Sequence, residues 1–288
     1  MKKIAEVMRA NGRHWVGDGF PVRSLFFYGD DAQAISPFLL FDYAGPHAFE
    51  PADRPRGVGQ HPHRGFETVT IVYDGEVSHR DSTGAGGTIG PGDVQWMTAA
   101  GGIIHEEFHS QAFTKTGGPF RMVQLWVNLP AKDKMMPPGY QSITKADVPV
   151  VDLAHGVGRV RVIAGTFAGT SGPARTFSPV NVWDVRLHRD ADITFDLPEG
   201  HTAMIAALSG KVTVNGSEQA EEAEVIRFER DGSQVKIHAD SDSILLVLTG
   251  EPIKEPVVGQ GPFVMNNEAE IRQAIDDFNR GRFGQVAH

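Results

Sequence analysis

The stretch HPHRGFETVTIVYDGEVSHRD, residues 61–81, decides the fold class. Its run of β-branched and aromatic residues stops at Asp74-Gly75 and a second strand-like run follows, which predicts a β-hairpin. The stretch opens with His61 and His63, one residue apart. Side chains two positions apart on a strand point to the same face, so we expect the two imidazoles to converge. They either bind a metal or are polar side chains of an ordinary solvent-facing strand.

The composition is that of a globular, β-rich protein. The 288 residues, 40% hydrophobic and 22% charged, allow one large domain or two of roughly 140 residues. The 33 glycines and 18 prolines favour many turns between strands. A net charge of −9 disfavours direct binding to nucleic acid. The sequence has no apolar run of membrane-spanning length and no convincing signal peptide, so we expect a cytoplasmic protein without a membrane contact.

The rest of the chain predicts more strands and a division into two halves. Strand-like segments continue through 87–108 and 119–130, and the Lys-, Met- and Pro-rich segment 131–141 is interpreted as an interdomain linker. Short strands between Gly, Asp and Asn turns then resume, with a similar density and length, which indicates an internal duplication. We therefore predict an N-terminal domain at 1–133 and a C-terminal domain at 134–288.

A single helix is predicted, at residues 267–280 near the C-terminus. Asn267 is the expected N-cap, with Glu270 three residues later in a capping-box arrangement, and Gly281 is the expected stop. Apolar residues at helical spacing line one face of this segment, which indicates a structural role.

A second histidine pair strengthens the metal interpretation. In IIHEEFH, residues 103–109, His105 and Glu107 share one strand face while Glu106 points away. Two such pairs can provide three imidazoles and one carboxylate, leaving open positions on an octahedral ion. The chain has no cysteine, so any metal must be held by nitrogen and oxygen ligands.

Two other residues compete for the last ligand position. Glu67 has the same strand parity as His61 and His63, and His109 has the same parity as His105 and Glu107. The remaining histidines lack partners at strand spacing and are interpreted as surface or turn residues: His14, His47, His79, His155, His188, His201, His238 and His288.

These motifs, together with PGDVQWMTAAGGIIHEE, QLWVNLP and EPVVGQGPFVMNNEAEI, resemble the pirin family of the cupin superfamily over nearly the whole chain. The resemblance implies an all-β bicupin, two antiparallel β-barrels with a short C-terminal helix. It places one metal in the N-terminal barrel, with His61, His63, His105 and Glu107 as ligands. Fe(II) is the first expectation for the metal, ahead of Mn, Ni, Cu, Co or Zn. The C-terminal half has no His-x-His pair, and we expect it to be metal-free.

The resemblance also implies a chemistry. Bacterial pirin-like proteins resemble quercetin 2,3-dioxygenases, which cleave a flavonol ring with O2 and release CO. Glu107 would then be both ligand and proton acceptor, and thus the catalytic residue. By sequence neighbourhood, candidates for an apolar slot over the metal are Phe41, Trp96, Phe108 and Trp126, and candidates for orienting the ligands are Arg64 and Gln124.

A function of another class stands beside this one. Mammalian members of the family imply an iron-containing, redox-responsive regulator that binds a transcription factor, and some bacterial members imply binding to a metabolic enzyme. A metal-dependent isomerase is a third possibility, because the fold does not fix the chemistry. An apolar slot open to the metal would favour an enzyme, whereas a capped metal beside a large exposed apolar patch would favour a protein partner. We expect a monomer.

Overall fold

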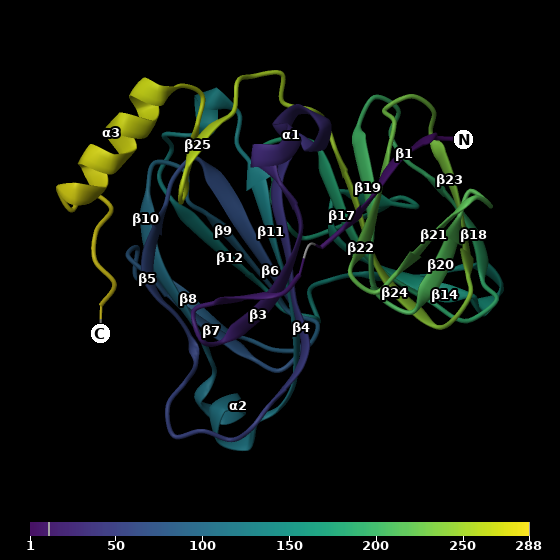
Figure 1. Ribbon diagram of the computed structural model, residues 1–288, viewed down its shortest axis with the longest axis horizontal. Coiled ribbons are helices and arrows are strands. Elements are labelled where there is room, and N and C mark those ends of the chain that lie inside the picture. The colour runs from purple at the N-terminus through teal and green to yellow at the C-terminus, as the bar shows by residue number, and fades with distance from the viewer. Residues whose placement is uncertain (11, 288) are drawn as a thin grey trace. The chain divides into compact units, whose positions relative to one another are not determined.

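The computed structural model, which describes residues 1–10 and 12–287, divides into two compact β-rich units. We call the unit formed by residues 12–32, 38–145 and the C-terminal segment from 253 the N-barrel. The C-barrel contains the first strand of the chain with residues 33–37 and 146–252. Each unit combines a seven-stranded and a four-stranded antiparallel sheet. Many of these strands are labelled in Figure 1. The predicted all-β bicupin architecture is confirmed.

The sheets of the N-barrel bring the histidine-bearing segments together. Its larger sheet has the order β12 (Gly139–Ile143), β9 (Val94–Thr98), β6 (Phe66–Asp74), β11 (Gly118–Asn128), β4 (Phe38–Phe49), β3 (Phe20–Phe27), β2 (His14–Val16). Its smaller sheet has the order β5 (Gly57–His63), β10 (Ile103–His109), β7 (Val77–Asp81), β8 (Gly86–Ile89). Its other elements are α2 (Gln111–Thr116), η1 (Ala131–Asp133), β25 (Val258–Gln260), β26 (Phe263–Met265) and α3 (Glu268–Asn279).

The C-barrel repeats this arrangement. Its larger sheet has the order β1 (Ile4–Arg9), β22 (Glu224–Phe228), β19 (Thr202–Ser209), β24 (Ser243–Gly250), β17 (Val180–Leu187), β14 (Gly158–Ala164), β13 (Val150–Asp152). Its smaller sheet has the order β18 (Asp192–Asp196), β23 (Gln234–Ala239), β20 (Lys211–Val214), β21 (Glu218–Glu221). The remaining elements of the chain are α1 (Tyr28–Ile35), η2 (Ala154–Gly156), β15 (Thr166–Phe167) and β16 (Thr170–Ser171).

Alternation along the strands fills the C-barrel with apolar side chains. On β19, for example, Ala203, Ile205 and Ala207 point into one cluster with Trp183 and Phe228. All five are buried, and this cluster is the hydrophobic core of the unit. The interior of the C-barrel is therefore a packed apolar core.

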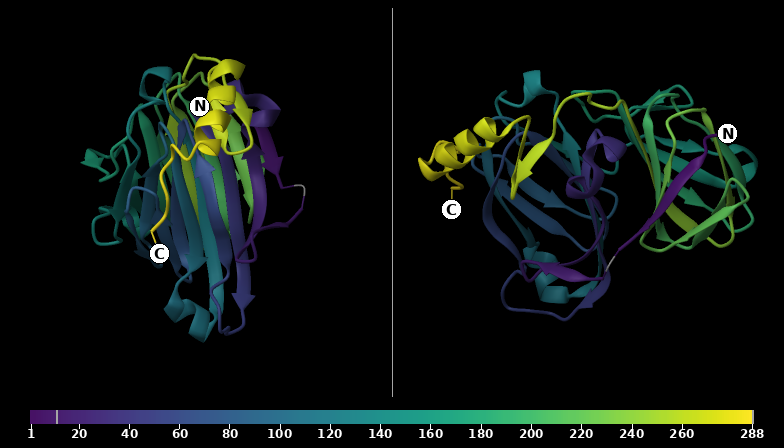
Figure 2. Two further views of the ribbon diagram at one scale, coloured as in Figure 1. Left: turned by 90° about the vertical axis from the view of Figure 1, so that its left-hand side faces the viewer. Right: turned by 45° about the horizontal axis from the view of Figure 1, so that its top comes forward.

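The two units are not the contiguous ranges 1–133 and 134–288 expected from the sequence. Strand β1 pairs antiparallel with β22 and so completes a sheet of the C-barrel. The C-terminal segment returns to the N-barrel, where α3 contacts β25 and β26 (Figures 1 and 2). Local sequence patterns identify strands but do not say which sheet a terminal strand joins.

The interpretation of 131–141 as a linker is also corrected by the structure. Gly139 and Tyr140 begin β12, which pairs with β9 in the large sheet of the N-barrel. Lys134 is buried, and its ammonium donates hydrogen bonds to the carbonyl oxygens of Gly65 and Val264 and to Asn128 Oδ1, at 2.6 to 2.9 Å. The sequence around a buried lysine that donates to backbone carbonyls can look the same as that of a solvated linker, so the burial of Lys134 was not predictable from the sequence.

The predicted helix is confirmed as α3. The Asn267 side chain accepts a hydrogen bond from the Glu270 amide at 3.0 Å, as an N-cap does. Glu270 reaches back to the amide of Asn266, one residue earlier than in the expected capping box. Within the described residues, no helix has the length and hydrophobicity needed to cross a membrane.

Candidate metal centre

Pairing between β5 and β10 brings three of the predicted ligands together. His105 lies opposite His61 in the antiparallel register, and Ile103 lies opposite His63. The ring centroid of His105 is 4.3 Å from that of His61 and 4.9 Å from that of His63. One ring nitrogen of each histidine lies within 4.8 Å of those of the other two. The spacing is compact enough for three imidazoles to share one ion.

The donor set fits a transition metal. Burial, followed by the neighbouring histidine His61, lowers the pKa of both His63 and His105 well below the ordinary value, so these imidazoles are neutral and have free lone pairs. Among the described residues, His63 Nδ1 and His105 Nε2 are buried without a hydrogen-bond partner. Buried polar atoms are rarely left unpaired, and a bound metal would satisfy both. The half-buried His61 donates from Nδ1 to the Gly59 carbonyl oxygen at 2.8 Å. Its Nε2 is therefore the nitrogen that can bind a metal.

Among the described residues, Glu107 is grouped with His105 and His79 rather than with the other two predicted ligands. The antiparallel pairing of β10 with β5 has a register shift between His105 and Glu107, so these two residues do not face β5 in regular alternation. Glu107 Oε1 accepts hydrogen bonds from Thr70 Oγ1 at 3.3 Å and Gln95 Nε2 at 3.4 Å. Its carboxylate forms a second compact group with His105 and His79. The predicted ligands therefore fall into two groups that share His105.

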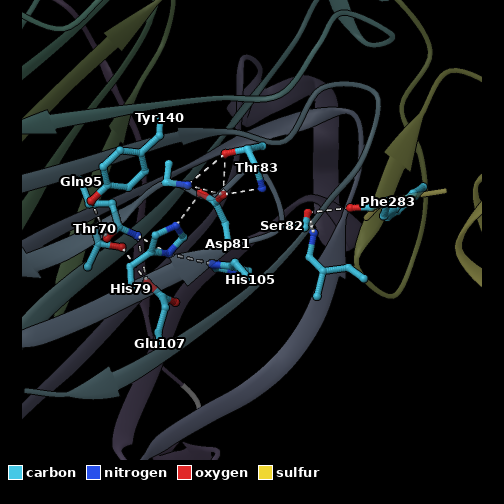
Figure 3. Close-up of polar contacts among 12 residues, drawn as sticks. Thr70, His79, Asp81, Ser82, Thr83, Gln95, His105, Glu107, Tyr140 and Phe283 are labelled. Atoms are coloured by element: carbon cyan, nitrogen blue, oxygen red, sulfur yellow. Dashed lines mark hydrogen bonds and ion pairs between the residues drawn. The ribbon is translucent and has the colours of Figure 1, made fainter. Parts of the chain in front are cut away.

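His79 corrects the sequence interpretation most clearly, because it was assigned to the surface. Only 1% of its surface is exposed, and its Nδ1 lies 3.2 Å from His105 Nδ1 (Figure 3). It stands opposite Glu107 in the pairing of β7 with β10. The pair His79 and Asp81 has the same spacing as the other two pairs, and this signal could have identified the residue. His288, assigned to the surface as well, lies outside the described residues.

The two competing residues are placed away from the three histidines. Glu67 is buried and accepts a hydrogen bond from Thr98 Oγ1 at 2.7 Å. His109 Nε2 donates to the Gly19 carbonyl oxygen at 2.9 Å, and its ring packs 4.5 Å from that of Phe49. Neither belongs to a compact group of metal-ligating side chains within the described residues.

Of the four aromatic residues considered for an apolar slot, Trp126 adjoins the histidines. Its ring centroid is 5.3 Å from His63 and 4.2 Å from Phe66, which the sequence analysis did not single out. Phe41 and Trp96 are fully buried. Phe108 lines a surface pocket that also contains Arg80 and Glu106, which form an ion pair at 2.6 Å. Glu106 thus points away from the site, as predicted.

The two proposed orienting residues differ in how they reach the site. Gln124 Oε1 accepts from Thr70 Oγ1 at 2.8 Å, so it is connected to Glu107 through one hydroxyl. Arg64 instead contacts the C-terminal segment, with Nη1 2.9 Å from Asp277 Oδ2 and Nε donating to the Gly101 carbonyl oxygen at 2.7 Å.

The comparison with protein families agrees with this fold. Residues 19–127 match the pirin family model, and residues 182–284 match the model of the pirin C-terminal cupin domain. The chain belongs to the pirin family.

Individual relatives cover almost all of the chain. A Pseudomonas aeruginosa protein provisionally named a quercetin 2,3-dioxygenase is 59% identical over 98% of this chain and 99% of its own length. A pirin-like protein of Caulobacter vibrioides is 42% identical over 92% and 94%. The crystal structure of a quercetin 2,3-dioxygenase from Acinetobacter baumannii superposes with a TM-score of 0.97, at 53% identity and with all of both chains covered.

Proposed function

We propose that this pirin is a metal-dependent dioxygenase that cleaves the ring of a flavonol with O2 and releases CO, as a quercetin 2,3-dioxygenase does. The observation that carries the proposal is the convergence of His61, His63 and His105, with the Glu107 carboxylate in an adjoining group that shares His105. The names of the Pseudomonas and Acinetobacter relatives support the choice of substrate class.

His61, His63, His105 and Glu107 would hold one divalent ion, with Fe(II) as the first candidate and Mn, Ni, Cu, Co or Zn as alternatives. Nitrogen and oxygen donors suit these ions. When bound, the metal supplies Lewis-acid stabilisation of an ionised substrate hydroxyl and access to O2.

Glu107 would accept the proton of the substrate hydroxyl. Gln95 donates to its Oε1, and the Thr70 hydroxyl, which shares its one proton between this oxygen and Gln124 Oε1, lies on the same side; together they hold the carboxylate in one orientation. Oε2 is then the oxygen that can take up a proton, and Glu107 would act as ligand and base in one site.

The half-buried face of the site suits a flat aromatic molecule. Trp126 and Phe66 form an aromatic wall beside His63, and Leu39 and Val264 pack behind it. His61 and Trp126 are both partly exposed, so we propose that the substrate approaches the centre along this wall. This arrangement favours an enzyme over a capped structural metal.

The test is quercetin cleavage by protein reconstituted anaerobically with Fe(II), followed by loss of the flavonol absorbance and by detection of CO. We expect turnover by the wild type, none by Glu107→Ala, and near-wild-type turnover by His109→Ala, a buried histidine outside the site. Loss of flavonol without CO would contradict the proposed reaction. Stoichiometric metal without turnover would favour the regulatory, partner-binding function.

A further inference from the structure

His79 and Asp81 form a buried pair directly behind His105. Both side chains are almost fully buried, and His79 Nε2 lies 3.0 Å from Asp81 Oδ2 (Figure 3). Neither residue belongs to the ligand set implied by the family resemblance. Their role therefore has to be derived from the hydrogen bonds around them.

Asp81 is fixed as a hydrogen-bond acceptor. Its Oδ1 accepts from the Thr83 amide at 2.8 Å and from Thr83 Oγ1 at 2.6 Å, and its Oδ2 faces His79. A carboxylate that receives these donors has no proton to give, so the proton between the pair belongs to His79 Nε2. With that proton directed from Nε2 to Asp81, Nδ1 of His79 is the ring nitrogen that has a lone pair for an incoming N–H group.

Gln95 supports the same assignment from the other side. Its amide nitrogen lies 3.1 Å from His79 Nδ1 and 3.4 Å from Glu107 Oε1, so its two N–H groups have one acceptor each. Its carbonyl oxygen accepts from the Tyr140 hydroxyl at 3.4 Å. The amide orientation and the His79 tautomer are consistent with each other.

These constraints decide the tautomer of His105. Its Nδ1 lies 3.2 Å from His79 Nδ1, which is an acceptor, so His105 Nδ1 must donate. The lone pair of His105 is then on Nε2, which is the buried nitrogen without a partner among the described residues.

We propose that His79, oriented by Asp81, is a positioning residue that holds His105 in the Nδ1–H tautomer with Nε2 free to bind the metal. His79 Nε2 faces Asp81, and the single lone pair of Nδ1 is shared by the N–H groups of Gln95 and His105, so His79 has no lone pair left for a metal. Tyr140 stacks on the ring at a centroid distance of 5.0 Å and an interplanar angle of 14°, which fixes its plane. Through Gln95 the same histidine is connected to Glu107. The inference rests on the metal centre of the proposed function.

The first experiment measures the affinity for Ni(II), by competition with a chromogenic chelator, in the full chain and three variants. His79→Leu removes the acceptor, and we expect the affinity to fall about 10- to 100-fold, as is usual when the partner of a ligating histidine is lost. His79→Asn places a carbonyl oxygen near the position of Nδ1, and we expect it to restore most of the affinity. His109→Leu removes another buried histidine of the N-barrel and should bind Ni(II) like the wild type. Circular dichroism verifies that each variant is folded.

The second experiment counts the imidazole ligands by X-ray absorption of the Ni(II)-loaded proteins. We expect the same number of imidazoles in the wild type and in His79→Leu. One imidazole fewer in His79→Leu would make His79 a ligand and overturn the inference, as would unchanged affinity in that variant. A wild type that binds no Ni(II), Fe(II) or other divalent ion would instead refute the metal centre itself.

Discussion

Glu67 is a carboxylic acid in an apolar interior. Only 1% of its surface is exposed, and burial raises its pKa from 4.5 to about 7, although the hydrogen bond from Thr98 opposes the shift. Because its pKa is higher in the folded than in the unfolded chain, the folded state binds the proton more tightly. Its contribution to stability is fully present below about pH 4.5 and is lost as the pH rises through about 7.

Glu67→Gln keeps an acceptor for Thr98 but cannot ionise. We expect the free energy of unfolding of the wild type, minus that of the variant, to fall by about 2.5 kcal/mol between pH 5 and pH 8. Urea unfolding of both proteins at each pH measures this difference. A difference that does not change with pH would show that burial does not raise the pKa of Glu67.

At the residue scale, the sequence predicted the three histidines that the structure brings together, because their strand spacing is a local property. Strand parity could not decide whether Glu67 or Glu107 is the carboxylate ligand. Strand β5 ends at His63 and β6 begins at Phe66, and Gly65 between them has a positive φ of 91°, so alternation is not continuous across the break. His79 reaches His105 only through the pairing of β7 with β10, which its immediate sequence does not encode.

At the scale of elements, α3 is attached to the N-barrel by a buried ion pair. Arg64, next to His63, pairs with Asp277 of the helix across 213 positions of sequence. The Arg64 guanidinium also lies 4.6 Å from the ring centre of Phe283. Apolar residues on one face, including Ile271 and Ala274, pack into the cluster around Phe263 and Met265.

Asp277→Ala leaves the Arg64 guanidinium buried and without its carboxylate. We expect a loss of roughly 3 kcal/mol in the free energy of unfolding, with faster amide exchange along α3. The matched control is Asp276→Ala, which removes an exposed pair with Arg280 on the same helix and should change stability by at most about 0.5 kcal/mol. Equal stability of the two variants, measured by urea unfolding and hydrogen exchange, would refute this role for Asp277.

The existence and limits of α3 were predictable, since the cap at Asn267 and the apolar periodicity are local. Its attachment was not, because an arginine beside a metal-binding motif could equally orient the ligands. The same limit applies to residues 131–141, where the composition of a linker conceals the edge strand β12 and a buried lysine.

At the scale of the whole molecule, each end of the chain completes a barrel built mainly by the other half. Duplicated strand patterns predicted two barrels, but the exchange of β1 and α3 depends on long-range pairing. In the described part of the chain, both compact groups of histidine and carboxylate ligands lie in the N-barrel and share His105. This distribution leads to the central claim, one metal per chain held at the paired strands β5 and β10.

Elemental analysis of the purified protein tests that claim most directly. We expect about one transition-metal ion per chain in the wild type and in His109→Ala. We expect almost none in the double variant His61→Ala, His105→Ala, provided that circular dichroism shows the variant to be folded. A wild type without metal after reconstitution, or a double variant that retains it in full, would contradict a metal centre at these strands.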